Sequence, residues 1–487
     1  MATLSLPLAF FLPLLTALAV FLVRARRAPW LPLLGALATV VAVADVVRQV
    51  AEHGPQVHHL GGWQPPLGVE LYADGLSALM LGMTALVGLA VTLYAGPYLR
   101  GKGYNTELFW PLWLVQWATL NGTFLSADLF NLYVMLELLT LTAAPLAAMA
   151  GDRPSLGAAM RYLLLALLGS LAYLLGVALL YGGTGTLHLR EVGELVGADA
   201  HTAVAAALIT AGLFAKAAVF PLHMWLMPAH SNAPAPASAA LSALVAKAGL
   251  YLVLRLWLWV FPVLLSTYMG WLIGALGALA VLYGSLQALR QPRLKQVIAY
   301  STIAQLGYLL LLLPMVVIPA AAVHAWQGVA YHALAHGFAK SAAFLAAGNM
   351  LYSLGHDRLE GLRGLTPYLS ITVLTLGLAF ASLMALPPSG GFLAKWLLLS
   401  GAISGGQWPW AVVIILGSVL AAAYAFRVLA LAHAAPPAGY TEVRPAQRVP
   451  RIMEWVPLLL VLIVYAMGVT AMPALGLLEQ GAPEGLQ

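Results

Sequence analysis

Long apolar stretches, separated by short polar connections, run from one end of the chain to the other. Most are about 20 residues long, the length that an α-helix needs to cross the hydrocarbon core of a bilayer. The pattern predicts an all-α polytopic membrane protein with about fourteen transmembrane helices. The expected spans are 4–23, 30–48, 75–98, 108–126, 129–149, 161–182, 203–222, 237–261, 268–289, 297–315, 320–349, 369–387, 392–433 with a break near Gly405, and 454–474.

Two apolar stretches are interrupted by prolines at corresponding places in the two halves of the chain. The interruptions lie at 216–221 and at 386–395. Broken hydrophobic segments in such positions are typical of a transport site between two inverted repeats. The prediction is a single membrane domain, 1–487, made of N-terminal helices (1–107), a first five-helix repeat (108–262), a second (263–435), and a loop with the last helix (436–487).

Three connections are longer than simple turns. The segment 51–74 is polar, and 183–202 carries three acidic residues and is expected to include a surface helix. The segment 434–450 is rich in proline and polar residues and is expected to be an ordered or semi-ordered loop. None of the three is long enough to form a soluble domain of appreciable size.

The composition supports this class of protein. Hydrophobic residues make up 62% of the 487 positions and charged residues only 8%, whereas soluble domains carry about 25% charged residues. The stretch 4–23 has no basic segment before it, so it is interpreted as a membrane helix and not as a cleaved signal. The chain has no cysteine, which excludes disulfides, thiolate-ligated clusters and a cysteine nucleophile. No cofactor is expected.

The net charge of +6 has a topological explanation. Most Lys and Arg residues fall in alternate connections, such as 24–27, 290–295 and 444–451, while the intervening connections hold very few. This positive-inside pattern places both termini on the outer side of a bacterial cell (inner) membrane. An excess of Lys and Arg with this distribution therefore does not indicate a nucleic-acid partner.

A small set of charged residues falls well inside the predicted spans. They are Glu137, Lys216, Lys247, Arg255, Lys340, Lys395 and Arg427. Ionisable groups within a membrane are costly and usually serve a function, such as carrying an ion. Arginine does not lose its proton in proteins, so the two arginines are predicted to be structural or to snorkel, and the lysines to be functional.

Glu137 is the only carboxylate near the middle of a span, and we expect it to pair with Lys216. Burial lowers the pKa of an amine toward neutral values, whereas a nearby carboxylate raises that pKa again. A change in the distance between the two groups would therefore change the affinity of the lysine for a proton. The alternative is a structural salt bridge that fixes two helices.

Two sets of histidines belong to the candidate site. His332, His336 and Lys340 are spaced i, i+4 and i+8, so they form one stripe on a helix and predict a proton relay. Core histidines and a zinc pair are the alternatives, and zinc is disfavoured because no third ligand lies nearby. His223 and His230 border the first interrupted helix, where they would either gate access or cap the helix. No metal site is predicted.

Four segments carry a family resemblance, namely 216–226, 229–239, 294–308 and 336–345. They resemble the antiporter-like subunits shared by respiratory complex I, membrane-bound hydrogenases and Mrp-type cation/proton antiporters. Segment 61–80 and the length of the chain are most similar to the D-type subunits of the Mrp-type Na+/H+ antiporters. The resemblance implies fourteen helices, two inverted five-helix repeats, and broken seventh and twelfth helices.

The resemblance also implies a hydrated axis along the middle of the membrane. Its members would be Glu137 on helix five, Lys216 on helix seven, Lys247 on helix eight, His332, His336 and Lys340 on helix eleven, and Lys395 on helix twelve.

Together these observations predict a proton-translocating subunit of a multi-subunit Na+/H+ antiporter, a secondary transporter subunit and not an enzyme. The expected partners are the other membrane subunits of that complex, H+ and Na+, and the lipid bilayer. The alternative is a proton-pumping subunit of a redox-driven complex, either an NADH:quinone oxidoreductase or a membrane-bound hydrogenase. A third interpretation, a scaffold without transport, is disfavoured by the intact series of lysines.

Overall fold

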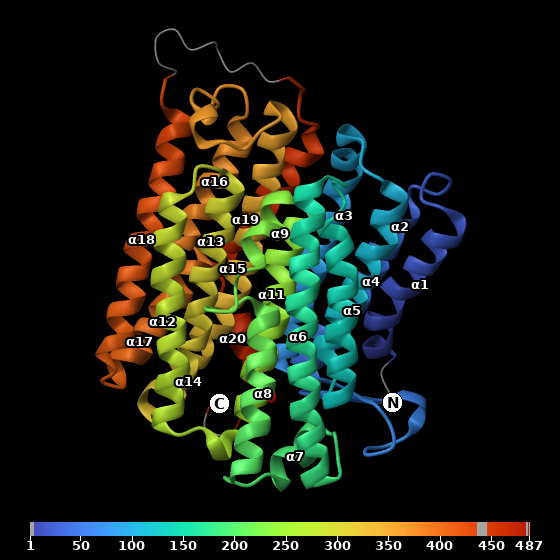
Figure 1. Ribbon diagram of the computed structural model, residues 1–487, viewed down its shortest axis with the longest axis vertical. Coiled ribbons are helices and arrows are strands. Elements are labelled where there is room, and N and C mark those ends of the chain that lie inside the picture. The colour runs from blue at the N-terminus through green and yellow to red at the C-terminus, as the bar shows by residue number, and fades with distance from the viewer. Residues whose placement is uncertain (1–3, 436–445, 484–485, 487) are drawn as a thin grey trace.

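The chain forms a tall bundle of α-helices that run along one common direction (Figure 1). The computed structural model describes residues 4–435, 446–483 and 486. The α-helices are α1 (Ser5–Val23), α2 (Leu31–His53), α3 (Gly75–Lys102), α4 (Thr106–Leu125), α5 (Leu129–Ala147), α6 (Arg153–Thr184), α7 (Leu189–Leu195), α8 (Ala200–Ala217), α9 (Leu226–Asn232), α10 (Ala235–Ala240), α11 (Ala246–Trp259), α12 (Thr267–Arg290), α13 (Leu294–Leu310), α14 (Leu312–Val316), α15 (Pro319–Leu354), α16 (Ser370–Leu383), α17 (Gly390–Ser404), α18 (Trp408–His433), α19 (Arg451–Val469) and α20 (Met472–Leu478).

Short elements of other kinds complete the described part of the chain. They are the strands β1 (Gln56–His59) and β2 (Glu70–Ala73), the 3₁₀ turns η1 (Leu60–Gly62), η3 (Pro262–Leu264) and η4 (Leu359–Leu362), and the π-helical turn η2 (Leu241–Val245).

The expected all-α membrane class is confirmed. In the described residues, 11 helices are long and apolar enough to cross a membrane, and α16 and α17 are shorter apolar helices. The helices α4 and α15 are 20 and 36 residues long and are buried in the bundle along most of their length. The count of fourteen crossings and the division into inverted repeats stay predictions.

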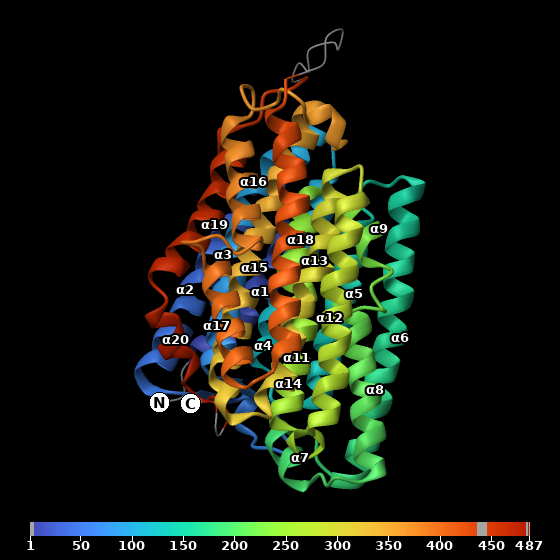
Figure 2. The same ribbon diagram turned by 90° about the vertical axis from the view of Figure 1, so that its left-hand side faces the viewer.

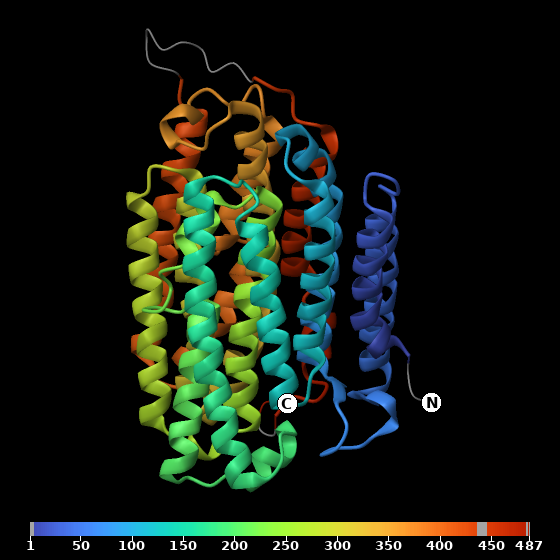
Figure 3. The same cartoon turned by 45° about the vertical axis from the view of Figure 1, so that its right-hand side comes forward.

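Three central helical segments are surrounded by protein on nearly all sides. The most apolar window of Ala235–Trp259 is 100% buried, that of Leu294–Val316 is 94% buried, and that of α3 is 72% buried, against 28% for α1. Figure 1 shows α11, α13 and α15 inside the bundle, and Figure 3 shows α1 and α2 (dark blue) at its edge. Polar side chains on the central helices are therefore enclosed by protein and do not face lipid.

The first predicted interruption lies between α8 and α9. The α8 helix ends at Ala217, because Ala218 has a left-handed backbone (φ 56°) and Pro221 cannot donate a helical hydrogen bond. The expected span 203–222 is therefore wrong at its C-terminal end. The Trp225 indole donates to the Ala215 main-chain oxygen (2.8 Å), which otherwise accepts only a long bond from the Ala218 N–H (3.4 Å) at the end of the broken helix.

The second predicted interruption lies between α16 and α17, with α16 above α17 in Figure 2. Ser389 caps α17 by accepting a hydrogen bond from the Phe392 main-chain N–H (3.2 Å). The break expected near Gly405 in the span 392–433 is present, because α17 ends at Ser404 and Gly406 has a positive φ (67°). The chain then returns through the bundle as α18.

A small β-structure covers one end of the bundle, and the sequence pattern did not predict it. The strands β1 and β2 form an antiparallel hairpin that pairs Gln56 with Ala73 and His59 with Glu70. Isolated bridges extend it, because Leu71 pairs with Ser126 and Asp128 pairs with His188. The surface helix expected in 183–202 is present as α7.

Both ends of the described chain lie at the end of the bundle that carries this β-structure (Figures 1 and 2). The basic connections 24–30 and 355–369 lie at the opposite end. This arrangement agrees with two termini on the same side, and the identity of that side stays a prediction. Of the expected loop 434–450, residues 436–445 lie outside the described residues.

Candidate functional site

The expected pair of Glu137 and Lys216 is present between α5 and α8. The Lys216 Nζ lies 3.7 Å from Glu137 Oε1. The same Nζ donates hydrogen bonds to the Leu136 main-chain oxygen (3.0 Å) and to Thr140 Oγ1 (2.9 Å). The amine is therefore held by two neutral acceptors on α5, with the carboxylate just beyond hydrogen-bond distance. Such a geometry can tighten or loosen with a small movement of either side chain.

Lys247 lies at a local widening of the helix that carries it. The π-turn η2 ends two residues earlier, and the Ala246 N–H donates to Leu241, five residues back. The Lys247 Nζ donates to the Ser242 main-chain oxygen (2.5 Å), and Ser242 Oγ lies 2.9 Å from Thr302 Oγ1 on α13. Single π-turns of this kind are frequent at functional sites.

The predicted stripe on α15 faces α13. His332 Nε2 lies 3.1 Å from the Gln305 main-chain oxygen, and the His332 and His336 rings stack with their centroids 5.7 Å apart. Neither ring nitrogen of His336 has a hydrogen-bond partner among the described residues. A buried imidazole with two free nitrogens is a site where a water can bind and exchange a proton.

Lys340 completes the stripe, and His230 approaches it from α9. The Lys340 Nζ donates to the Ile298 main-chain oxygen (2.8 Å) and to Ser301 Oγ on α13. The His230 ring stacks on Phe344, one turn after Lys340, with a centroid separation of 4.7 Å. Both ring nitrogens of His230 are also without a partner in the described part of the chain.

Lys395 belongs to the second interruption. Its Nζ donates to the Leu383 main-chain oxygen (2.8 Å) at the end of α16 and lies 4.5 Å from the centre of the Tyr308 ring. The Tyr308 ring in turn packs edge-on against His332, with centroids 5.3 Å apart. Tyr308 thus connects Lys395 with the α15 stripe. The sequence offered no signal for this role, because a tyrosine in an apolar helix is most often a core residue.

Apart from Lys216, whose charged neighbour is Glu137, these groups form one electrostatic cluster. Lys247 and Lys340 both interact with His336, and Lys247, Lys295 and Lys340 all interact with His230. The structure therefore places His230 among the lysines, which sequence position alone could not show. The α8 and α11 helices pack closely beside the two lysines of the first half, because a Cβ at Gly249 would lie 2.9 Å from the Ala217 Cβ.

His223 lies apart from this cluster. It packs on the Phe220 ring (5.5 Å) and on Tyr283 of α12 (4.9 Å). Its position at the break between α8 and α9 agrees with the expected location. Its role as a gate or a cap stays a prediction.

Lys295 is a buried group that the sequence pattern assigned to a loop. It is 1% exposed in the first turn of α13, and its Nζ donates to the Ala233 main-chain oxygen (2.5 Å) at the end of α9. The neighbouring Arg293 pairs with Asp357 at 2.7 Å. The basic residues before Lys295 made it look like part of a polar connection. The apolar residues that follow it nevertheless suggested the start of a helix.

The two membrane arginines have local partners, which agrees with the structural role predicted for them. Arg255 forms a buried, two-pronged ion pair with Asp74, the N-cap of α3. Arg427 donates to the main-chain oxygens of Leu289 (2.5 Å) and Gln291 (3.0 Å) and so closes the C-terminal end of α12. Arg255 is thus paired with an opposite charge, whereas Arg427 has neutral acceptors as the lysines do and differs from them in lying at the end of α12.

The four predicted lysines are all enclosed. Their exposed fractions are 6% for Lys216, 1% for Lys247, 0% for Lys340 and 3% for Lys395. Each donates to neutral carbonyl or hydroxyl oxygens, and only Lys216 has a carboxylate within 4 Å in the described chain. No group of three or more His, Cys, Asp or Glu residues that could hold a metal ion occurs in the residues that the structure describes.

The fold and the site together define a polytopic membrane protein with a buried series of ionisable groups between interrupted helices. The family described as NADH:quinone oxidoreductase/Mrp antiporter, TM matches residues 126–421, which is more than half of the chain. The chain therefore belongs to this family.

Relatives and solved structures agree with this assignment. The chain is 35% identical over 435 residues to an NADH-quinone oxidoreductase subunit N of Desulforudis audaxviator, covering 87% of this chain and 85% of the relative. It is 29% identical to the D-type subunit of a Na(+)/H(+) antiporter of Bacillus subtilis, covering 78% and 76%. A chain in the structure of the Mrp complex from Dietzia sp. superimposes with a TM-score of 0.89 and 25% identity, covering 99% of this chain and 98% of that one.

Proposed function

We propose that this chain is the proton-translocating subunit of a multi-subunit Na+/H+ antiporter of the bacterial cell membrane. The observation that carries the proposal is the enclosed series of amines and imidazoles, which has a single carboxylate at one end. Such groups can each gain and lose a proton near neutral pH when burial and neighbours adjust them. A structural network would instead pair each charge with an opposite one, as Arg255 and Asp74 do.

The pair of Glu137 and Lys216 acts as the switch at one end of this series. When the carboxylate approaches, it stabilises the ammonium form of Lys216 and draws a proton onto it. When the carboxylate withdraws, the amine still has the Leu136 and Thr140 oxygens as partners, and it loses the proton more easily. The distance of 3.7 Å supports this switch, because it lies just beyond hydrogen-bond length.

From Lys216 the proton passes toward the middle of the bundle. Lys247 and Lys340 receive it through His336, whose free ring nitrogens accept and donate in turn. His332 continues the series toward Lys395, and the Tyr308 ring packs between these two groups. Waters complete the links, since a proton moves along a chain of hydrogen bonds without displacement of heavy atoms.

The neighbours of this chain supply the rest of the exchange. Other membrane subunits carry Na+ in the opposite direction, and both termini of this chain lie on the outer side. A membrane potential contributes about 2.3 kcal/mol per charge for each 100 mV, so it couples directly to the movement of H+. The chain is a transporter subunit and catalyses no bond change beyond proton transfer.

A redox-driven complex is the second candidate, and the relative named NADH-quinone oxidoreductase subunit N favours it. Purification of the native complex, followed by identification of its chains, separates the two. Small membrane subunits without cofactors support the antiporter. Chains that hold iron–sulfur clusters, flavin or nickel would instead support the redox-driven complex.

The proposal is tested with membrane vesicles that contain the complete complex. Replacing Lys216 with Ala should abolish Na+-dependent proton movement across the vesicle membrane, while assembly of the complex stays intact. The matched control is Arg427→Lys, which keeps a cation at the end of α12 outside the series. Exchange at the wild-type rate in the Lys216→Ala complex would refute the proposal.

A further inference from the structure

A large cavity lies at the end of the bundle that carries the basic connections. Its volume is about 560 Å³, within the range of about 300–1,000 Å³ that ligand pockets occupy. Its lining comes from the connection between α1 and α2, the start of α2, one face of α3, the start of α4 and Ile452 of α19. Figure 3 shows the pair α1 and α2 (dark blue) beside α3 and α4 (lighter blue), and the cavity lies between these two pairs.

The wall of the cavity changes from apolar to basic along α3. Leu93, Gly96, Pro97 and Arg100 all line it, and their spacing places them on one face of the helix. Arg100 belongs to the last turn of α3, and Arg26 lines the cavity from the connection between α1 and α2. A molecule that matches this wall is apolar at one end and negatively charged at the other.

Exposed tryptophans place the basic part of the cavity at the level of lipid head groups. Trp30 at the start of α2 follows Pro29, which lines the cavity, and Trp455 lies one turn after Ile452. Both indoles are exposed at the surface of the bundle. Tryptophan is enriched where a membrane protein meets the interface between hydrocarbon and water. The cavity therefore opens where a phospholipid changes from acyl chain to head group.

The Arg100 guanidinium is turned back along α3. Its Nη2 and Nη1 atoms lie 3.8 and 3.9 Å from the point where a Cβ of Gly96 would be. The side chain thus reaches over the preceding turn, as long side chains on helices do. The guanidinium has no hydrogen-bond or ion-pair partner among the described residues. An unpaired arginine of this kind is well suited to bind a phosphate group.

The Trp110 indole supplies a second free donor at the same place. Trp110 is 8% exposed, and its N–H has no hydrogen-bond partner in the described part of the chain, although a buried indole N–H usually finds one. The neighbouring Trp113, by comparison, donates to Thr92 Oγ1 (3.0 Å). The Trp110 Cζ2 atom, two bonds from the indole nitrogen, lies 4.0 Å from the same Cβ position of Gly96. The guanidinium and the indole therefore meet over Gly96.

A carboxylate beside the cavity forms part of its framework. Glu107 accepts hydrogen bonds from the main-chain N–H groups of Ala25 (3.0 Å) and Arg26 (2.9 Å), and it lies 3.4 Å from Arg26 Nε. It thereby fixes the connection between α1 and α2 to the start of α4 and offsets the charge of Arg26. Arg100 keeps its charge, so the cavity still favours an anion.

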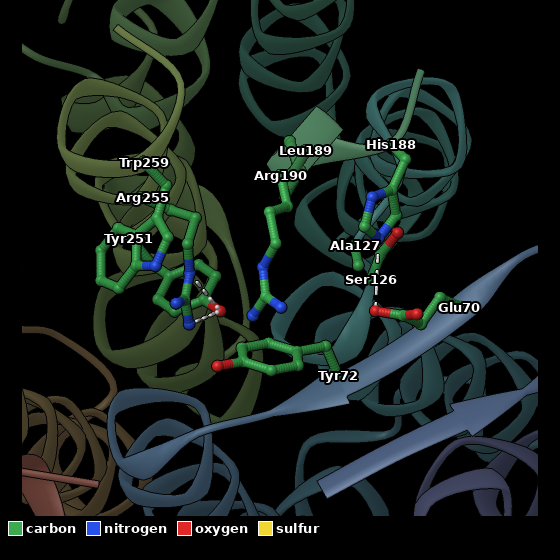
Figure 4. A pocket seen from close by; sticks show the side chains of 10 residues that line it. All are labelled: Glu70, Tyr72, Ser126, Ala127, His188, Leu189, Arg190, Tyr251, Arg255 and Trp259. Atoms are coloured by element: carbon green, nitrogen blue, oxygen red, sulfur yellow. Dashed lines mark hydrogen bonds and ion pairs between the residues drawn. The ribbon is translucent and has the colours of Figure 1, made fainter. Parts of the chain in front are cut away.

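A cavity at the opposite end of the bundle does not have this form. Its volume is about 40 Å³, room for roughly three waters at about 10–15 Å³ each. Figure 4 shows charged side chains on opposite sides of it. Arg255 is paired there with Asp74, and Glu70 with His188. These charges are used within the fold, whereas Arg100 has no such partner.

We propose that the large cavity binds one anionic phospholipid. The Arg100 guanidinium and the Trp110 N–H hold its phosphate, and an acyl chain lies along Leu93 and Pro97. The positive-inside pattern assigns this end to the cytoplasmic leaflet, which carries anionic lipids, and basic pockets between membrane helices on that side suit their head groups. A free phosphate would leave the apolar wall uncovered. The site lies outside the proposed proton series and does not depend on it.

Binding is measured by native mass spectrometry on the complete complex, purified in a neutral detergent and freed of lipid. The probe is dioleoyl phosphatidylglycerol, and phosphatidylcholine with the same acyl chains is the neutral comparison. After dissociation of the complex in the gas phase, this chain should carry one phosphatidylglycerol. Its affinity for phosphatidylglycerol should exceed that for phosphatidylcholine by at least about fivefold. Inorganic phosphate at the same concentration should not displace the lipid.

The role of the charge is tested with Arg100→Gln. The affinity for phosphatidylglycerol should fall about fivefold, the effect of one basic residue near an anionic head group. Arg100→Lys keeps the charge and should retain most of the affinity. The matched control is Arg290→Gln, because Arg290 is also exposed in the last turn of a helix, α12, and does not line the cavity. It should bind the lipid as the native chain does.

The role of the space is tested with Gly96→Leu, which leaves the charges unchanged. The nearest atoms that an added Cβ would meet lie at 3.8 Å or more, so the helix can accept it. The larger side chain should then abolish binding of both lipids. Gly157→Leu on α6 is the control, since a Cβ at Gly157 meets no atom within 4 Å and lies outside the cavity.

Three results would overturn the proposal. They are equal affinity for phosphatidylglycerol in the native complex and in both Arg100→Gln and Gly96→Leu, equally tight binding of phosphatidylcholine to the native complex, and displacement of the lipid by inorganic phosphate. The Lys216→Ala complex should bind the lipid as the native complex does. A failure of the proposed function therefore leaves this result unaffected, and the reverse also holds.

Discussion

The Nζ atom of Lys395 donates a 2.8 Å hydrogen bond to the main-chain oxygen of Leu383, the last residue of α16. A helix that stops inside a membrane leaves carbonyl groups without partners, and such ends are tolerated only where protein or water satisfies them. Here the Lys395 amine itself satisfies one. The interruption of the helix and the position of the lysine are therefore parts of one structural feature.

This relationship leads to a first prediction for Lys395→Arg. Arginine keeps the positive charge and can still donate to Leu383, but it does not release its proton in proteins. Proton transport should fall by about two orders of magnitude or more, since each unit of pKa changes the equilibrium tenfold. Proton transport is measured as Na+-dependent pH changes in membrane vesicles. Arg427→Lys is the reverse exchange outside the series and should transport normally.

Glu137→Gln tests the switch more finely than removal of the lysine. The amide keeps the shape and the hydrogen-bonding capacity of the side chain but removes the charge that favours the ammonium form of Lys216. Transport should fall by at least about tenfold, and the remaining activity should have a different dependence on pH. Thr140→Val, which removes one neutral acceptor of the same amine, should have a much smaller effect. Equal effects of the two changes would show that packing, and not charge, is responsible.

His336 is the third target because its ring nitrogens have no protein partner in the described chain. His336→Phe should keep the stacking on His332 and block transport, since a phenyl ring carries no proton. The rate of H+ uptake by vesicles gives the result. His433→Phe is the control, as His433 lies at the end of α18 away from the cluster and bonds only locally, to the Leu429 oxygen.

Asp74→Asn should destabilise the protein without acting on the series directly. Loss of one member of a buried ion pair leaves the other charge unpaired, which costs about 3–5 kcal/mol. The thermal midpoint of the purified complex should drop markedly. The exposed pair of Arg48 and Asp45 provides the comparison, and Asp45→Asn should change the midpoint very little. A small effect of Asp74→Asn would show that this ion pair contributes little to stability.

The surroundings of Glu70 predict how acid acts on the end of the bundle that carries the β-hairpin. Hydrogen bonds from His188 and His59 lower the pKa of the Glu70 carboxyl below its ordinary value. A lowered pKa stabilises the folded state fully above the ordinary pKa of about 4.3, and that contribution is lost as the pH falls through the lowered value. Hydrogen exchange of segment 56–73 should be faster in Glu70→Gln than in the native chain at about pH 6, and the difference should vanish at about pH 2. The exposed Glu52 is the control, and Glu52→Gln should leave the exchange unchanged. A difference that persists in acid would exclude this carboxyl as its cause.

Local patterns in the sequence determined the class of protein, the two interruptions, the stripe of His332, His336 and Lys340, and the structural role of the arginines. These features depend on residues within a few turns of one another, or on the cost of placing a charge in hydrocarbon, and so they are visible in a single chain. The pairing of Glu137 with Lys216 was predictable for a related reason. One carboxylate among several buried amines leaves few alternatives.

Only the tertiary structure decided which distant residues meet. It buried Lys295, placed His230 among the lysines, and inserted Tyr308 between Lys395 and His332. Each of these contacts joins helices that are far apart in the sequence, and helix packing fixes them through shape and close approach. Hydropathy and spacing record how one helix meets its surroundings, but they do not record which helix lies beside it.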